Sequence, residues 1–239
     1  MAEDGVEHTV WSMRDPDLIQ QTMSDFQTVK ALYIADGHHR SAAASRVRAA
    51  QSQVKIDSVN RPEEGFLAVI FPHDELQILP YNRLVQDLNG HTPQQFLETL
   101  ALRYDLQSTN QPGQAPEGGF DMYLEGHWQR ATPRPLKNQQ TRLEDPVSAL
   151  AVSVLTERVL DPLLGIKDQR SDPRIDFVGG GRPPQELEAR VDSGEWAVAF
   201  WLYPTTLEEL MAVSDAEQIM PPKSTRKTPK LKARKYEQK

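Results

Sequence analysis

The sequence predicts an α+β fold in which mixed sheets and helices are interleaved along the chain. Apolar residues at helical spacing alternate with short apolar runs that are typical of strands. Their order does not follow the strict strand–helix–strand repeat of a parallel α/β protein, and no internal repeat is visible. The 239 residues, of which 38% are hydrophobic, are enough to bury a core.

The first 105 residues are expected to form one part of the protein. Its helices carry start signals: Asp15 and Thr92 are capping residues, and each is followed by a proline suited to the first helical turn. The expected elements are a helix after Pro16, a buried strand at 31–35, an alanine-rich helix from about His38 to Ala50, a hairpin of 66–71 with 76–79, and a helix from Thr92 through Tyr104.

A second α+β part is expected at residues 120–222, after a loop at 107–119 that is rich in Gln, Pro and Gly. Gly179, Gly180 and Gly181 follow one apolar run and predict a loop that ends a strand. The expected elements are strands at 120–124 and 127–131, a helix at 145–160, a strand at 174–178, a helix at 183–191, a strand at 196–202 and a helix at 206–216.

Residues 223–239 are expected to form a basic, flexible tail. Eight of the 27 Lys and Arg residues lie in this tail, whereas residues 1–222 carry 19 basic and 33 acidic side chains. An acidic body repels phosphate backbones, so nucleic acid is an unexpected partner.

The composition also excludes some classes of chemistry. With no cysteine, the chain has no disulfide, thiolate metal site or cysteine nucleophile. No apolar run approaches the ~20 residues that a spanning helix needs, and the start lacks the pattern of a signal peptide. We therefore expect a cytoplasmic protein without a membrane partner, while the oligomeric state is left open.

The segment from Asp36 to Arg40 carries the clearest functional signal, because it joins the expected strand to the expected helix. Gly37 suits a turn that a side chain would obstruct, and the first turn of a helix directs free backbone amides toward an anion. Arg40 adds a forked donor that matches phosphate oxygens, and His38 or His39 adds a donor or a proton acceptor. Asp36 is suited to a metal ion, to a hydroxyl proton or simply to the turn.

Two other interpretations of this segment are open. An Asp-Gly pair before a helix is also a common arrangement of turn and cap, and on its own that reading is about as good as the functional one. A zinc site is disfavoured, because adjacent histidines such as His38 and His39 point to different sides of a helix.

Four blocks of the sequence resemble the domain-of-unknown-function family 1015, in the order expected for the C-terminal portion of its members. The blocks are Tyr33-Ile-Ala-Asp-Gly-His-His-Arg40, Ile78-Leu-Pro-Tyr-Asn-Arg83, Ile175-Asp-Phe-Val-Gly179 and Met220-Pro-Pro-Lys-Ser-Thr225. The first block is the most specific of the four.

The resemblance implies a strand–turn–helix element similar to that of the ParB/sulfiredoxin-like group, within residues 1–105. Members of that group bind nucleotide phosphates there and include free serine kinases that use ADP or ATP, which also implies Mg²⁺. By this resemblance Asp36, His38 and His39 are candidate catalytic residues, with Asp36 the candidate metal ligand. The implied phosphate-binding residues are Gly37, His38, Arg40, Arg83, Lys223, Ser224 and Thr225.

The sequence therefore predicts a phosphate- or nucleotide-binding protein, with a phosphotransferase acting on a small hydroxyl substrate such as free serine as the favoured activity. Two alternatives use the same residues. One is a phosphatase of phosphoamino acids with water as the acceptor, and the other is a ParB-like regulatory module that binds nucleotide without turnover.

Overall fold

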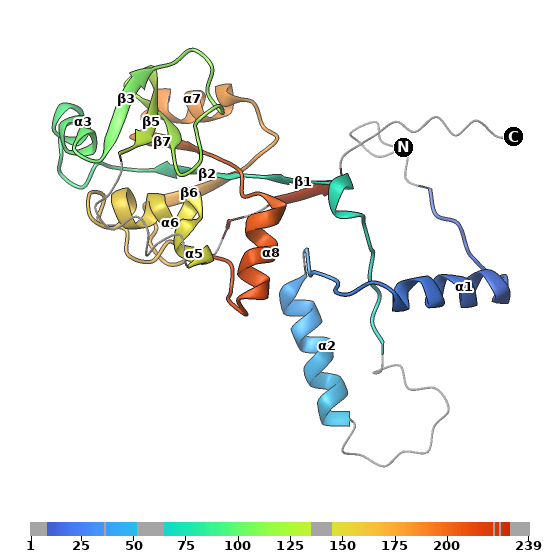
Figure 1. Ribbon diagram of the computed structural model, residues 1–239. Helices are drawn as coiled ribbons and strands as arrows, with labels where there is room; N and C mark the ends of the chain where they lie inside the picture. The colour runs from blue at the N-terminus through green and yellow to red at the C-terminus, as the bar shows by residue number, and fades with distance from the viewer. Residues whose placement is uncertain are drawn as a thin grey trace, which may run out of the picture.

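The structure is a computed structural model that describes residues 9–35, 37–51, 65–134, 145–221, 223–224 and 226–229. Its main body is one antiparallel sheet of six strands in the order β3-β5-β4-β7-β2-β6 (Figure 1). The six strands are β2 (Tyr81–Val85), β3 (Tyr104–Ser108), β4 (Phe120–Leu124), β5 (His127–Pro133), β6 (Ile175–Gly179) and β7 (Val198–Leu202). The predicted α+β class is confirmed.

The strands predicted at 120–124, 127–131, 174–178 and 196–202 are present as β4, β5, β6 and β7. The hairpin of β4 and β5 closes at Glu125 and Gly126, with φ angles of 48° and 79°. Two successive positive φ angles are what a tight two-residue hairpin turn requires. The sheet also takes β2 and β3 from residues before 109, so it spans both expected parts of the chain.

Side chains on the two faces of the sheet pack into two apolar clusters. On β7, Val198, Phe200 and Leu202 enter the larger cluster, and Ala199 between them enters the smaller one. This alternation is the period of two that a strand buried on both faces must have. The larger cluster contains residues of α3 and α6, whereas the smaller one contains residues of α7.

The predicted helix starts are confirmed by their caps. Thr92 and Thr206 each form a capping box, with Gln95 and Glu209 respectively, at the starts of α3 (Pro93–Ala101) and α8 (Leu207–Asp215). Helix α7 (Pro184–Asp192) also lies where it was predicted. Helix α3 ends earlier than predicted, because Tyr104 already belongs to β3.

The helix predicted at 145–160 is broken into three pieces: α5 (Pro146–Ala149), α6 (Ala151–Leu155) and the π-helical turn η3 (Thr156–Leu160). The break lies at Leu150, whose ψ of 139° is extended rather than helical. The Leu150 side chain is fully buried in the larger cluster. Hydrophobic spacing therefore indicated the buried residues correctly and missed the interruption.

The hairpin predicted from 66–71 and 76–79 is wrong. After the short helix η2 (His73–Glu75), strand β1 (Leu76–Leu79) pairs with β8 (Arg226–Pro229), so that Leu79 lies opposite Arg226. Residues 66–71 are not in a strand, and Leu67 is 93% exposed. Four residues of the expected tail thus form part of a two-stranded ribbon.

The buried strand predicted at 31–35 is also absent, and Leu32 is 61% exposed. A short apolar run becomes a strand only when another strand pairs with it, and none in the described part of the chain does so. The helices on either side of this run, α1 (Pro16–Gln27) and α2 (His38–Gln51), are present as predicted. Both helices lie away from the six-stranded sheet (Figure 1). The Tyr33 hydroxyl donates to Asp215 at the end of α8 over 2.8 Å.

Across the described ranges, none of the helices has both the length and the apolar character needed to cross a bilayer.

Candidate functional site

Helix α2 begins with a turn that only glycine adopts easily. Gly37 has a φ of 82°, and its carbonyl accepts the amide of Ser41 over 2.9 Å as the first helical hydrogen bond. Arg40 bends back over this turn, because a Cβ added to Gly37 would lie 3.4 Å from Arg40 Nη2. Arg40 is exposed. The predicted helix start and the predicted guanidinium therefore lie together.

The first turn of α2 contains Arg40 and no acidic residue; the first turns of α3, α5 and α6 also lack an acidic residue. Helices α1, α7 and α8 each carry an acidic residue in the first turn, where it stabilises the helix dipole. Helix α2 has none, and its sequence there is His38-His39-Arg40. A cation at this end, such as Arg40, interacts unfavourably with the helix dipole, and a bound anion would offset that unfavourable interaction. Asp36 and the side chains of His38 and His39 lie outside the described part of the structure.

Arg83 lies on β2 between Phe200 of β7 and Phe177 of β6, and its side chain is completely buried. The guanidinium carbon sits 5.4 Å from the centre of the Phe177 ring. Within the described residues no carboxylate contacts Arg83, and its burial lowers the pKa of the guanidinium to about 9. The group remains charged at neutral pH, inside the protein.

The donors of Arg83 are directed at neutral oxygen atoms. Nη2 donates to the carbonyl of Lys223 over 3.0 Å, and Nη1 donates to the carbonyl of Tyr81. Nε donates to Gln169 Oε1 over 3.4 Å. Gln169 in turn donates to the hydroxyl of Thr156, at the first residue of the π-helical turn η3, over 2.7 Å.

The Lys223–Ser224 turn therefore lies against β2, although 140 residues separate Lys223 from Arg83. Lys223 has a φ of 52°, a left-handed conformation that costs a residue with a side chain roughly 1–2 kcal/mol. Its Nζ lies 5.7 Å from the centre of the Tyr81 ring, while Ser224 is buried. Thr225 is outside the described residues.

Gly180 allows the chain after β6 to pack closely against Pro80, directly before β2. Its amide donates to the carbonyl of Pro80 over 2.7 Å, and a Cβ on Gly180 would meet that same oxygen at 2.7 Å. The predicted role of the three glycines, a loop that ends a strand, is confirmed, because β6 ends at Gly179.

Two of the sequence blocks thus meet in space. Tyr81 and Arg83 come from the second block, and Lys223 and Ser224 come from the fourth. Gln169 and Thr156, which extend this cluster, were missed by the sequence analysis. They belong to none of the four blocks, and a lone Gln or Thr has no pattern that could have revealed them.

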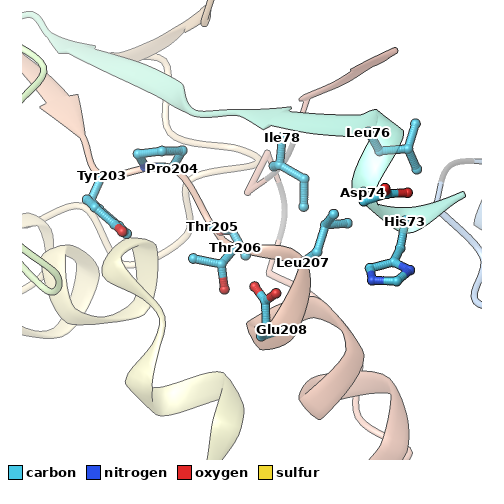
Figure 2. Close-up of a pocket in the computed structure, with 10 residues that line it drawn as sticks. All are labelled: His73, Asp74, Leu76, Ile78, Tyr203, Pro204, Thr205, Thr206, Leu207 and Glu208. Atoms are coloured by element: carbon cyan, nitrogen blue, oxygen red, sulfur yellow. The ribbon is translucent and has the colours of Figure 1, made fainter. Parts of the chain in front are cut away.

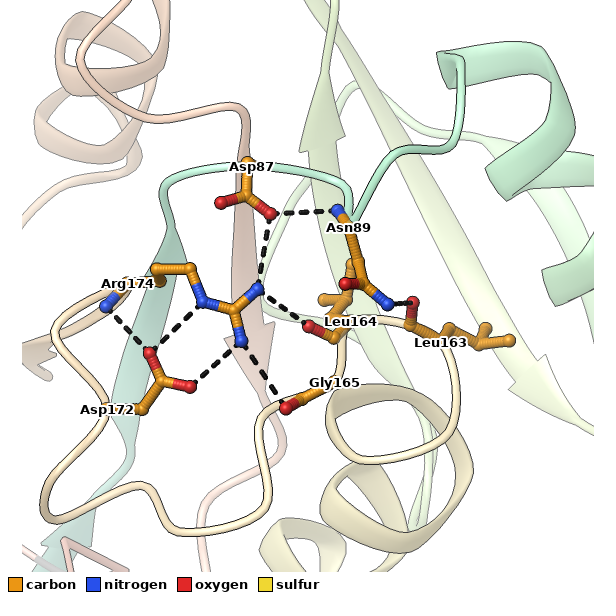
Figure 3. Close-up of polar contacts among 7 residues, drawn as sticks. All are labelled: Asp87, Asn89, Leu163, Leu164, Gly165, Asp172 and Arg174. Carbon is orange, nitrogen blue, oxygen red and sulfur yellow. Dashed lines mark hydrogen bonds and ion pairs between the residues drawn. The ribbon is translucent and has the colours of Figure 1, made fainter.

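A second polar network lies at the other end of β2 (Figure 3). Arg174 contacts Asp172 at 2.9 Å and Asp87 at 3.4 Å, and also donates to the carbonyls of Leu164 and Gly165. The hydrogen bond from Arg174 lowers the pKa of Asp172 below its usual value. Because every donor is directed at protein oxygen, this network holds the loop after η3 in place.

A shallow pocket of about 450 Å³ lies between η2, β1 and the start of α8 (Figure 2). Ile78 and Leu207 give it apolar walls, and Asp74 and Glu208 add carboxylates. None of the predicted site residues that the structure describes lines it. Among the described residues, no group of three or more His, Cys, Asp or Glu side chains is placed to hold a metal ion.

The structure is an α+β protein with two basic sites. One is Arg40 at the start of α2, and the other is the buried Arg83, which is hydrogen-bonded to the turn that contains Lys223. The chain belongs to the family described as "Protein of unknown function (DUF1015)", whose model matches residues 1–153. The match includes the first two blocks, and the blocks at 175–179 and 220–225 lie beyond it.

A comparison with curated proteins finds no match. Among solved structures, the chain is similar to "Free serine kinase in complex with AMP", with 15% identity, a TM-score of 0.40, and coverage of 91% of this chain and 82% of that chain. It is also similar to a conserved hypothetical protein from Pyrococcus furiosus, with 17% identity, a TM-score of 0.39, and coverage of 89% and 82%. A mutant free serine kinase in complex with ADP gives 17% identity, a TM-score of 0.37, and coverage of 82% and 67%.

Proposed function

We propose that this protein binds the phosphates of a nucleotide at the start of α2 and transfers a phosphoryl group to a small hydroxyl substrate such as free serine. The observation that carries the proposal is the turn at Gly37, where the exposed guanidinium of Arg40 lies over the first turn of a helix that has no acid there. Backbone amides and a forked cation together match the oxygens of a phosphate group.

The proposed reaction needs an anion held in place and a base. The substrate hydroxyl oxygen attacks the terminal phosphorus of ATP or ADP, and the bond from phosphorus to the bridging oxygen breaks. The nucleotide leaves with one phosphate fewer, and the hydroxyl proton passes to the base. His38 or His39 is the proposed base, and Asp36 is the competing one. Arg40 and the helix amides stabilise charge on the transferring group.

Lys223, Ser224 and Thr225 form the second proposed group of phosphate contacts, next to the buried Arg83. Support for this comes from the turn itself: an exposed lysine is held in a left-handed conformation above a buried cation that has no carboxylate partner among the described residues. The lysine ammonium is the group of this turn that a phosphate at the surface can reach.

Nucleotide binding is tested by calorimetric titration of ATP and of ADP into the wild-type protein, Arg40→Ala and Arg48→Ala. Arg48 is the matched control, because it is an exposed arginine in the last turn of the same helix. Loss of a charged hydrogen bond should weaken binding by about 1.5–3 kcal/mol in Arg40→Ala. Arg48→Ala should bind as the wild type does. Equal losses in both variants would contradict a site at the start of α2.

Turnover is tested by incubating the protein with ATP or ADP, Mg²⁺ and serine, and by following phosphoserine. Phosphoserine that forms in the wild type and not in Arg40→Ala supports the phosphotransferase. Binding heat without phosphoserine would replace it with a nucleotide-binding module. Release of phosphate from added phosphoserine without nucleotide would indicate the phosphatase.

A further inference from the structure

We infer that Arg83 acts through the backbone of Lys223: it is a positioning residue that fixes the Lys223–Ser224 turn so that the lysine ammonium faces the anionic ligand. This inference rests on the proposed function for its ligand, and on the contacts of β2 for its geometry. It gives Arg83 a role different from the direct phosphate contact that the sequence predicted.

The first argument is burial. Arg83 has no exposed surface, whereas Lys223 is exposed directly above it. Arg83 Nη2 donates to the carbonyl of Lys223 over 3.0 Å, although the two residues are 140 positions apart in the sequence. A ligand at the surface would therefore meet the lysine first, and the guanidinium would lie behind the peptide chain.

The second argument is the conformation of Lys223. A φ of 52° is unfavourable for lysine, so other contacts must hold it. Two are present: the hydrogen bond from Arg83 to the backbone, and the Tyr81 ring 5.7 Å from the ammonium. Tyr81 and Arg83 are two residues apart on one strand, so β2 fixes both the carbonyl and the side chain of the same residue.

The third argument is the remaining support of the guanidinium. Gln169 accepts from Arg83 Nε and is itself tied to Thr156, and the Phe177 ring packs 5.4 Å from the guanidinium carbon. These contacts restrain the arginine side chain, so Nη2 is held in a fixed position facing the carbonyl of Lys223. A fixed donor can hold a turn, which a mobile surface arginine could not do.

The turn itself is tested by limited trypsin digestion, with cleavage after Lys223 and after Lys30 followed by mass spectrometry. Lys30 is an exposed reference site in the segment between α1 and α2. In the wild type, cleavage after Lys223 should be slower than after Lys30, and equal rates would overturn the inference without any variant. In Arg83→Lys, which keeps the charge and loses the fork, cleavage after Lys223 should accelerate roughly tenfold or more, while cleavage after Lys30 stays the same.

The ligand part is tested by a double-mutant cycle on the affinity for ADP, with Arg83→Lys, Lys223→Ala and the double variant. If Arg83 acts only through Lys223, Arg83→Lys weakens binding roughly tenfold in the wild-type background and has no further effect beside Lys223→Ala. Additive losses would mean that Arg83 contacts the ligand independently, and would overturn the inference.

The two experiments separate this inference from the proposed function. If the wild-type protein binds neither ADP nor ATP, the proposed function fails together with the ligand part, and the cleavage rates alone decide whether Arg83 holds the turn. If ADP binds and cleavage after Lys223 does not respond to Arg83→Lys, the proposed function survives and the inference is overturned.

Discussion

Replacing Asp121 by alanine should destabilise the protein strongly, because this carboxylate is a buried charge with several partners. Asp121 lies on the central strand β4 with no exposed surface. Its oxygens accept Arg130 Nε over 2.9 Å and Nη2 over 3.2 Å, together with the amides of Gly113 over 2.7 Å and Gln114 over 3.2 Å. Removing it leaves Arg130 Nε and the amides of Gly113 and Gln114 without their acceptor, while Arg130 Nη2 keeps the carbonyl of Gln111.

The expected magnitude follows from these contacts. Breaking a buried ion pair by removing one partner costs about 3–5 kcal/mol. The side chain of Arg130 is 23% exposed, so water partly replaces the lost carboxylate and the lower end applies. We expect the free energy of unfolding of Asp121→Ala to fall by about 3 kcal/mol, or the Tm by roughly 6–12 °C. Asp121→Asn keeps the shape and one acceptor, and should lose about half as much.

The assay is urea unfolding at neutral pH, followed by circular dichroism for the wild type and both variants. The slope with urea should stay the same, so that the midpoints report stability alone. A loss below about 1 kcal/mol in Asp121→Ala would refute the reasoning. It would mean that water accepts the hydrogen bonds of the amides in the loop at 109–119 as well as the carboxylate does.

Three further outcomes are expected. Burial, and secondarily the hydrogen bond to Asp192, raise the pKa of Tyr123 to about 12. Its contribution to stability is therefore complete below the ordinary pKa of 10 and is lost as the pH rises from 10 toward 12. Alkaline spectrophotometric titration should show a late-titrating tyrosine that Tyr123→Phe lacks. Gly180→Ala should cost about 1–3 kcal/mol in urea unfolding, because the new Cβ would lie 2.7 Å from Pro80 O. Gly65→Ala is its control, with nothing within 4 Å of the added atom, and an equal effect there would contradict the steric explanation. Thr92→Ala and Thr206→Ala should each lose about 1 kcal/mol on thermal unfolding, since each removes a capping box; no change would mean that water caps these helices equally well.

Features set by a few adjacent residues could be predicted from the sequence. The caps at Thr92 and Thr206 and the strands at 120–124 and 127–131 were found because their signals are local. The runs at 31–35 and 66–71 have the same apolar character and form no strand, since strand formation depends on a partner that the run itself does not contain. The pairing of β1 with β8 joins residues about 150 positions apart, and no local pattern encodes it.

The candidate site was predictable to a similar degree. The motif gave the helix start at His38 and the nearby Arg40, and the second and fourth blocks gave Arg83 and Lys223. Their contact joins residues 140 positions apart and depends on the ribbon of β1 and β8, which brings the Lys223–Ser224 turn next to β2. A sequence shows that an arginine follows an apolar strand, but not whether the guanidinium reaches solvent.

Two consecutive polar residues in the middle of a central strand also need an explanation, because apolar residues usually fill such positions. Asn82 accepts the amide of Leu202 over 3.3 Å, and Arg83 faces the opposite side of the strand toward Lys223. Burying the guanidinium without a carboxylate costs several kcal/mol, and its two hydrogen bonds to carbonyls return about 1.5–3 kcal/mol each. The net effect is close to zero. We therefore expect Arg83→Met to change the free energy of unfolding by less than about 2 kcal/mol in urea titrations, while cleavage after Lys223 accelerates. A loss of 4 kcal/mol or more would show that the sheet itself needs the guanidinium, and that holding the turn is secondary.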